Sequence, residues 1–411
     1  MRRSALVMGL CLALAIACAA SGKIIYVDDD ANAPGDGKSW VTAYRYLQDA
    51  LADARAAEKP AEIRVGQGVY KPDQGASQKA GDRLASFALV SGVVLKGGYV
   101  GIMTADPNAQ DVKLYEAILS GDLAGNDVLS EDPLDFVADP NDGDWARPTV
   151  WNLLIESTRR ENSVHVLVAN RTDQTAILDG FTVTGGNAYH PPYKAAFAFD
   201  DHDRGGAMLN KGGSPTVRSC TFMANSAIGG GGAVYCKGPC RLEMTRCHFL
   251  DNFNWRGAGG AINNYSASII MTNCVFERND SWISFGAAIY TALCHHEIVD
   301  CTFSQNGRIK GDSVSAAYVW QGDGFFNYCQ FAHNALGGVA VTNHSNMLLQ
   351  SCKFVSNSGD EGGGINCSAM SKVKLDKCRF IFNDGARGGG LFISSTELSV
   401  TNCLFYANQA N

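Results

Sequence analysis

The sequence has little charge and no basic excess. Charged residues make up 18% of the 411 residues and hydrophobic residues make up 46%, a composition that predicts a folded chain with a buried core. Asp and Glu number 41 against 34 Lys and Arg, so the net charge is −7. Nucleic acids and anionic membranes demand basic patches, which this balance disfavours. We therefore expect neutral glycans, cations or other proteins as partners, and no nucleic acid.

Long apolar runs are also scarce. The longest, residues 5–20, follows Arg2-Arg3 and is shorter than the ~20 residues that a membrane-spanning helix needs. A basic start, a short apolar run and small residues after it are typical of a secretory signal peptide, predicted here as residues 1–21. Processing as a lipoprotein at Cys18 is an alternative. The sequence predicts export, to the medium or to the cell surface and outer membrane, without a transmembrane helix.

Fourteen cysteines suggest disulfides at first, but their spacing indicates a repeat instead. Eight of them follow one another at intervals of 27, 27, 27, 28, 23, 26 and 25 residues, and each has Phe two residues later and Asn five residues later. Each unit of about 26 residues holds three short stretches of period 2 and no helix-period segment. That pattern is typical of one coil of a parallel β-helix. The eight are Cys220, Cys247, Cys274, Cys301, Cys329, Cys352, Cys378 and Cys403.

Equivalent residues of successive coils are expected to stack into columns. The alternation places the Cys and Phe columns inside, and the Asn column at a corner where side-chain amides bond along the stack. Gly residues after the Asn supply the backbone angles of the corner. In-register side chains point the same way, so we expect the eight column cysteines to be free thiols. Cys236 and Cys240 lie off the column and form the best candidate disulfide.

The N-terminal half predicts a strand at residues 24–28 and a helix that Ser39 caps and that ends before Pro60. This amphipathic helix is expected to cover the open edge of the first coil. Strands are expected at residues 62–65 and 87–99, an irregular acidic stretch at 100–160, and a first repeat coil at 178–187. The apolar face of the helix consists of Trp40, Tyr44, Leu47, Leu51 and Ala54. The predicted units are residues 1–21 (signal peptide), 22–160 (cap and first strands) and 161–411 (β-helix repeats).

The irregular stretch contains one candidate calcium site. Carboxylates clustered around a Gly turn suit an oxygen cage, although the spacing and closing Glu of a helix-loop-helix site are absent. An ordinary solvated turn is the alternative, and no other cofactor is expected. The candidate ligands are Asp139, Asn141, Asp142 and Asp144.

Two groups of sequence motifs resemble those of known families. Gly-Gly-Ala-(Val/Ile) and Phe-x-x-Asn, for example at residues 231–234 and 249–252, resemble the repeats of polymorphic outer membrane proteins. The opening Tyr26-Val-Asp-Asp-Asp30 and the later Leu178-Asp-Gly-Phe-Thr182 are similar to exported right-handed β-helix proteins of the pectate-lyase-like superfamily. The resemblance covers nearly all of the mature chain and implies an all-β, right-handed parallel β-helix with three strands per coil. It implies no single activity, because that superfamily mixes lyases, hydrolases and adhesins.

Catalytic carboxylates are the first kind of site to consider. Glu243 and Glu297 share one outward position two coils apart, about 9.6 Å by the rise of the ladder. This lies at the far limit of the ~6.5–9.5 Å between the acid and base of an inverting glycosidase. Ile270 stands between them, so two surface glutamates without a catalytic role are the alternative. His165 lies in an apolar strand and is interpreted as a core residue.

Two other features suggest ligand binding. An insertion lengthens the first coil to 39 residues, between Phe181 and Cys220, and combines aromatic rings, carboxylates and imidazoles that suit a sugar or a cation. Trp255 and Trp282 follow the corner Asn of neighbouring coils and are expected to stack, as a glycan platform or as a buried corner contact. The insertion residues are Tyr189, His190, Tyr193, Asp200, Asp201, His202 and Asp203.

The sequence thus favours a secreted or cell-surface, non-catalytic β-helix that binds glycan or protein ligands. A polysaccharide lyase or glycoside hydrolase is the main alternative, and a purely structural spacer is another. Asn408 completes a coil three residues before Asn411, so we expect an exposed final coil that self-associates end to end, or a truncated reading frame.

Overall fold

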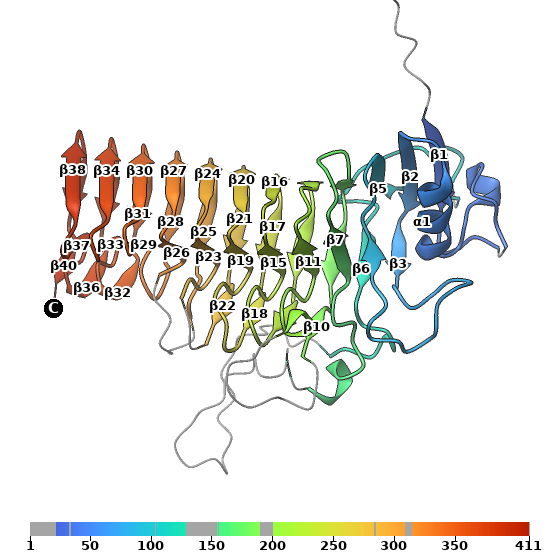
Figure 1. Ribbon diagram of the computed structural model, residues 1–411, viewed down its shortest axis with the longest axis horizontal. Coiled ribbons are helices and arrows are strands. Elements are labelled where there is room, and N and C mark those ends of the chain that lie inside the picture. The colour runs from blue at the N-terminus through green and yellow to red at the C-terminus, as the bar shows by residue number, and fades with distance from the viewer. Residues whose placement is uncertain are drawn as a thin grey trace, which may run out of the picture.

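The chain folds into an elongated solenoid of parallel strands (Figure 1). The computed structural model describes residues 22–32, 34–102, 104–128, 154, 156–189, 200–282, 285–308 and 315–410. Each turn of the solenoid adds one strand to each of three long sheets, whose pairs are all parallel. The architecture confirms the predicted parallel β-helix with three strands per coil.

The three long sheets run along the whole solenoid. The 12-stranded sheet consists of β1 (Lys23–Val27), β2 (Ala61–Gly66), β5 (Val93–Tyr99), β8 (Ile177–Asp179), β12 (Thr216–Arg218), β16 (Arg241–Thr245), β20 (Ser268–Thr272), β24 (His295–Val299), β27 (Asp323–Asn327), β30 (Asn346–Gln350), β34 (Lys372–Asp376) and β38 (Glu397–Thr401). The 11-stranded sheet consists of β3 (Gly68–Tyr70), β6 (Ala117–Ser120), β9 (Thr182–Thr184), β13 (Thr221–Met223), β17 (His248–Leu250), β21 (Val275–Glu277), β25 (Thr302–Ser304), β28 (Gln330–Ala332), β31 (Lys353–Val355), β35 (Arg379–Ile381) and β39 (Leu404–Tyr406). The 10-stranded sheet consists of β4 (Phe87–Ala88), β7 (Leu167–Asn170), β11 (Met208–Lys211), β15 (Val234–Lys237), β19 (Ile262–Tyr265), β23 (Ile289–Ala292), β26 (Ala317–Trp320), β29 (Val339–Thr342), β33 (Ile365–Cys367) and β37 (Leu391–Ile393).

Two short sheets line a corner between the long ones. The first has four strands, β10 (Asn187–Ala188), β14 (Ser226–Ala227), β18 (Phe253–Asn254) and β22 (Asp280–Ser281). The second has three strands, β32 (Ser358–Glu361), β36 (Asp384–Arg387) and β40 (Gln409–Ala410).

The N-terminal cap is shorter than predicted. Ser39 caps only a 3-10 turn, η1 (Trp40–Thr42), and the helix proper is α1 (Leu47–Ala56). The predicted continuous helix is wrong because Tyr44 pairs as an isolated bridge with Val27 at the edge of β1, so its backbone is extended. Leu47, Leu51 and Ala54 do bury the predicted face against the first strands, and Figure 1 shows α1 at that end of the solenoid.

The solenoid strands before residue 161 differ in part from those predicted. The strand expected at residues 87–99 is two strands, β4 and β5, which belong to different sheets. The acidic stretch expected to be irregular contains β6, which joins β3 to β9 in the 11-stranded sheet. In the first predicted coil, Val183 pairs with Phe222, which confirms its place in the Phe column. The strands before residue 161 therefore extend the same three sheets.

The predicted columns are present. The Phe rings from Phe222 to Phe405 stack with centroids 4.6–5.0 Å apart. Each corner Asn from Asn225 to Asn383 donates through Nδ2 to the Oδ1 of the next corner Asn, at 2.8–3.1 Å. All eight column cysteines are free, as expected, and each Sγ donates to the carbonyl two residues earlier at 3.1–3.5 Å.

Each coil turns through left-handed residues that are not glycine. The residue before every column Cys and the residue before every corner Asn has φ between 49° and 56°, as at Arg246 and Asp251. Glycines after the Asn also have positive φ, as predicted: Gly259 has φ +75°, and a Cβ there would meet the carbonyl of Ile262. The left-handed turn before each corner Asn could not be predicted from the sequence, because no glycine occupies it.

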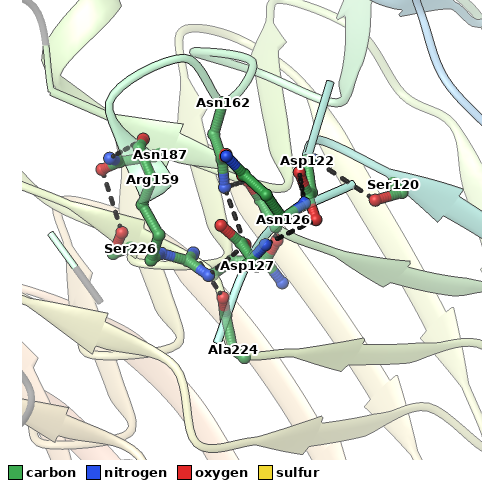
Figure 2. Close-up of polar contacts among 12 residues, drawn as sticks. Ser120, Asp122, Asn126, Asp127, Arg159, Asn162, Asn187, Ala224 and Ser226 are labelled. Carbon is green, nitrogen blue, oxygen red and sulfur yellow. Dashed lines mark hydrogen bonds and ion pairs between the residues drawn. The ribbon is translucent and has the colours of Figure 1, made fainter. Parts of the chain in front are cut away.

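An ion-pair network joins residues 122–127 to residues 157–162 beside β9 and β13 (Figure 2). The turn η2 (Ser157–Arg159) ends in Arg159, which donates to Asp127 Oδ2 at 2.7 Å and to the Ala224 carbonyl at 2.9 Å. Asn162 donates to the same Asp127 oxygen at 2.9 Å. Burial raises the pKa of the Asp127 carboxyl and Arg159 opposes that shift. The network closes the base of a long connection against the solenoid wall.

Across the described residues, no helix has the length and apolar character needed to span a bilayer.

Candidate functional site

The outward surface of the 10-stranded sheet carries a group of aromatic side chains beside charged ones. Strand alternation points Val234 and Ile289 into the core, so their neighbours Tyr235 and Tyr290 point outward. The pairing register places equivalent outward side chains beside one another on successive coils. We call this surface the aromatic face: Tyr235, Tyr265, Phe285, Tyr290, Tyr318 and Trp320.

The rings of the aromatic face form a partly exposed stripe. Tyr318 stacks on Phe285 at 4.5 Å and on Tyr290 at 5.8 Å between ring centroids. Tyr265 is 41% exposed and Phe285 is 45% exposed, whereas Tyr235 and Tyr318 are buried, at 4% and 9%. From Tyr235 on β15 to Trp320 on β26 the sheet advances three coils, which is about 14 Å at ~4.8 Å per coil. A stripe of ring faces with this length suits an extended ligand that stacks flat apolar surfaces on it.

Charged groups gather at the β11 end of the aromatic face. Arg204 Nη1 donates to the Tyr235 hydroxyl at 2.7 Å, and its guanidinium lies 4.9 Å from the centroid of the same ring. Lys211, paired in register with Lys237, forms an ion pair with Asp201 at 2.5 Å. Burial raises the pKa of Tyr235, so its hydroxyl stays protonated at neutral pH. Hydrogen-bond donors and acceptors of both charges therefore flank the first ring.

His165 lies under this charged end. Its Nδ1 is 3.0 Å from the Gly205 carbonyl, which only accepts, so Nδ1 carries the proton and Nε2 holds a lone pair. Among the described residues Nε2 has no hydrogen-bond partner. Burial lowers the pKa of His165 to about 4, so the ring is neutral at pH 7. The residue is buried as predicted, but it retains an unused basic nitrogen.

The predicted insertion site is only partly described. His190 and Tyr193 lie outside the described residues, and Tyr189 is half-buried with its carbonyl bonded to Arg83. The turn η3 (Asp201–Asp203) is closed by a capping box between Asp200 and Asp203. It delivers Asp201 to Lys211 and stacks His202 on His165 at 6.3 Å between ring centroids.

Trp255 and Trp282 follow β18 and β22 on neighbouring coils. Both are half-buried against Ala224 and Phe253, and Arg256 lies 4.3 Å over the Trp255 ring. Their predicted role as a glycan platform stays a prediction.

The candidate acid pair lies on another surface. Glu243 pairs with Ile270 and Ile270 with Glu297, so the predicted two-coil separation is correct. Glu297 lies 3.4 Å from His295, whereas Glu243 lies 3.9 Å from Arg241. Each glutamate thus has its own nearby ionic partner on the 12-stranded sheet.

Two clusters of three acidic residues in the described part of the chain have the geometry to hold a metal ion. Asp28, Asp29 and Asp30 form one, and Asp122, Asp127 and Glu161 form the other. In the first, Asp28 accepts from the backbone of Asp30 and Ile102. In the second, Asp127 is held by Arg159. Backbone donors and an arginine thus already contact one carboxylate of each group. The predicted calcium ligands Asp139, Asn141, Asp142 and Asp144 lie outside the described residues.

The sequence pattern does not predict the aromatic face, because its rings do not recur at one position of every repeat. The rings follow the inward residue of the third strand by one position at Tyr235, Tyr290 and Tyr318, but that position holds Asn263 on β19. Aligning the repeats on Gly-Gly-Ala-(Val/Ile), and then comparing the next residue, would have revealed it.

Comparison with known families agrees with the observed coils. The family described as "right handed beta helix region" matches residues 162–317 and 287–411, more than half of the chain. The chain belongs to the right-handed β-helix family. None of the curated proteins searched matches this member of the family.

Solved structures similar to this right-handed β-helix protein include several enzymes that act on polysaccharides. A rhamnogalacturonan lyase is 12% identical with a TM-score of 0.50, and the match covers 92% of this chain and 87% of the lyase. An alginate lyase from Paenibacillus sp. is 10% identical with a TM-score of 0.45, covering 91% of this chain and 99% of the lyase. At such identities the likeness shows a shared fold and leaves activity open.

Proposed function

We propose that the protein binds a polysaccharide along the aromatic face. The observation that carries this proposal is the row of rings from Tyr235 to Trp320, in which Tyr318 stacks on Phe285 and Tyr290. Arg204, Lys211 and Asp201 lie at one end of this row. Sugar rings present apolar C–H faces to aromatic rings and hydroxyls to charged groups, so one extended chain can satisfy both parts. The match to a polysaccharide lyase supports the same ligand class through the fold alone.

Glycan-array screening followed by calorimetry tests the proposal. Tyr265→Ala and Trp320→Ala are each expected to weaken binding about 3- to 10-fold, because each removes one stacking surface. Tyr328→Ala is the matched control, since Tyr328 is 61% exposed at a corner before the 11-stranded sheet. An unchanged affinity in the first two variants, or an equal loss in the control, contradicts the proposal.

A second candidate is a polysaccharide lyase centred on the charged end of the aromatic face. His165 holds a neutral nitrogen base that is buried beneath this end, and Arg204 with Tyr235 places a cation and a proton donor beside it. Lyase chemistry needs a base for the sugar C–H, a donor for the leaving oxygen and a cation beside the uronate carboxylate. Incubation with uronate polysaccharides, with and without calcium, tests it through the ultraviolet absorbance of unsaturated products. Turnover abolished by His165→Gln favours the lyase, whereas absence of turnover on every uronate leaves the binding role.

A further inference from the structure

Two cysteines of β15 and the turn after it face each other. Cys236 and Cys240 enclose Lys237-Gly238-Pro239, and their Sγ atoms lie 3.1 Å apart. Both are free thiols in the structure, so the disulfide predicted from the sequence is not formed there. Asn210 on the neighbouring coil donates to Cys236 Sγ at 3.1 Å and reaches Cys240 Sγ at 3.8 Å. One amide thus holds both sulfurs on the same side of the turn.

The column cysteines are arranged differently. Each of the eight donates its S–H to the carbonyl two residues earlier, as Cys247 does to Thr245 at 3.5 Å. In the described chain no hydrogen bond runs from either Cys236 or Cys240 to a carbonyl, and each sulfur has the other as its neighbour. Column cysteines on successive coils also contact one another, as Cys247 does Cys274, but each of them keeps a carbonyl acceptor. The short loop instead leaves the Cys236 and Cys240 sulfurs with each other.

We propose that Cys236 and Cys240 form a disulfide when the protein meets a thiol oxidant, while the eight column cysteines remain thiols. This inference does not depend on the proposed polysaccharide binding. The bond would fasten the end of β15, which carries Tyr235 and Lys237, to the start of β16.

The chemistry is thiol–disulfide exchange with an external disulfide such as oxidised glutathione. Cys240 attacks first, because it is the more exposed of the two at 8% and because the hydrogen bond from Cys236 lowers its pKa. Its thiolate forms a mixed disulfide with one glutathione and expels the other as a thiolate. Cys236 then gives up its proton, attacks the Cys240 sulfur and expels the second glutathione. Two cysteine thiols are oxidised, one glutathione disulfide is reduced, and the two protons finish on the released glutathione thiols.

Peptide mapping of the full chain tests the pair. The native protein is incubated with oxidised glutathione, denatured in acid, alkylated with N-ethylmaleimide and digested with trypsin without reductant. Cleavage after Lys237 separates residues 219–237 from residues 238–241, and the second peptide contains Cys240 as its single cysteine. We expect the two peptides to remain joined until reductant is added, with Cys220 alkylated.

Recovery of both peptides separately, with Cys236 and Cys240 alkylated, overturns the proposal. A bond from either cysteine to Cys220 or Cys294 overturns it as well. Cys294→Ser is the matched control, because Cys294 lies off the column and accepts from Asn264 at 3.2 Å. The Cys236–Cys240 link is expected to survive in that variant and to be lost in Cys240→Ser.

A thermal measurement supplies a second criterion. Adding reductant to the oxidised protein is expected to lower its melting temperature by about 2 °C, since the bond restrains the unfolded chain. The double variant Cys236→Ala/Cys240→Ala should show no such response. An equal response in that variant would assign the shift to the column thiols and contradict the proposal.

Discussion

At the scale of single residues, the buried charges are held by one or two specific partners. Arg159 is 1% exposed and Asp127 is its partner in the network that closes the 122–162 connection (Figure 2). Removing one member of a buried ion pair leaves the other charge uncompensated, which costs far more than the pair itself contributes.

Asp127→Ala is therefore expected to lower the free energy of unfolding by about 3 to 5 kcal/mol. Denaturant unfolding followed by circular dichroism measures the loss. The double variant Asp127→Leu/Arg159→Met is the control, because it removes both charges together and should recover most of the stability. A single variant as stable as the parent protein would show that the pair is not a structural clamp.

Two buried histidines make the stability depend on pH. Burial lowers the pKa of His165 and of His296 to about 4, from an ordinary value of 6.5. Both ring nitrogens of His296 lack partners among the described residues. The folded state therefore binds fewer protons than the unfolded state between those two values. Stability is fully present above pH 6.5 and is lost as the pH falls toward 4.

Replacing His296 tests this dependence. We expect the parent protein to lose on the order of 3 kcal/mol through His296 alone between pH 7 and pH 4. His296→Leu keeps an apolar side chain in the core and should flatten that part of the profile in denaturant melts at several pH values. If the unfolding free energy of the variant depends on pH as steeply as that of the parent protein, the proton uptake occurs at another residue and the prediction is wrong.

At the scale of elements, each coil is held by the same few contacts repeated along the solenoid. In the Asn column, Asn279 donates to Asn306 Oδ1 on the following coil at 3.1 Å and accepts from Asn252 Nδ2 on the preceding coil at 2.9 Å. A side chain in the middle of the ladder thus bonds to the coils on both sides. The column supports the corner that carries β18 and β22.

Asn279→Ala is expected to destabilise the protein by about 2 to 4 kcal/mol, because buried donors and acceptors on two neighbouring coils lose their partners. Asn408→Ala is the comparison at the end of the ladder, where water can replace the lost bonds since the residue is only half-buried. Thermal melts of the two variants give the order of the effects. Equal losses at both positions would contradict the ladder as the source of the stability.

At the scale of the whole molecule, the two ends of the solenoid differ. Helix α1 covers the first strands, whereas β37, β38, β39 and β40 are the outermost strands of their sheets at the other end (Figure 1). There Phe405 is 45% exposed, although its column neighbour Phe380 is fully buried. A flat apolar strand edge is a template for pairing with another chain.

We propose that a polypeptide ending at Asn411 associates through this exposed strand edge. Light scattering after size exclusion should show a mass that rises with concentration. The double variant Val400→Lys/Leu404→Lys places charges on two exposed positions of the end strands and should give a monomer, as charged edge residues do in natural sheets. A monomer in the unaltered protein would contradict end-to-end association.

Much of the fold followed from periodicity. The repeat of Cys, Phe and Asn specified the coil length, the columns and the free thiols, because identical residues at equal spacing stack only if every coil has the same shape. The helix boundary at Leu47 and strand β6 did not follow, since each depends on backbone pairing with distant strands: Tyr44 with β1, and β6 with β3 and β9.

The candidate site could be predicted from the sequence only in part. The insertion predicted Asp201 and His202 as site residues. Tyr235, Tyr290 and Tyr318 were not predicted, because they come from three different coils and belong to no common sequence motif. The sequence by itself determined which side chains lie inside the solenoid, because inside and outside alternate along every strand. The tertiary structure alone decided which outward side chains lie together, because parallel register brings residues some 27 positions apart into contact.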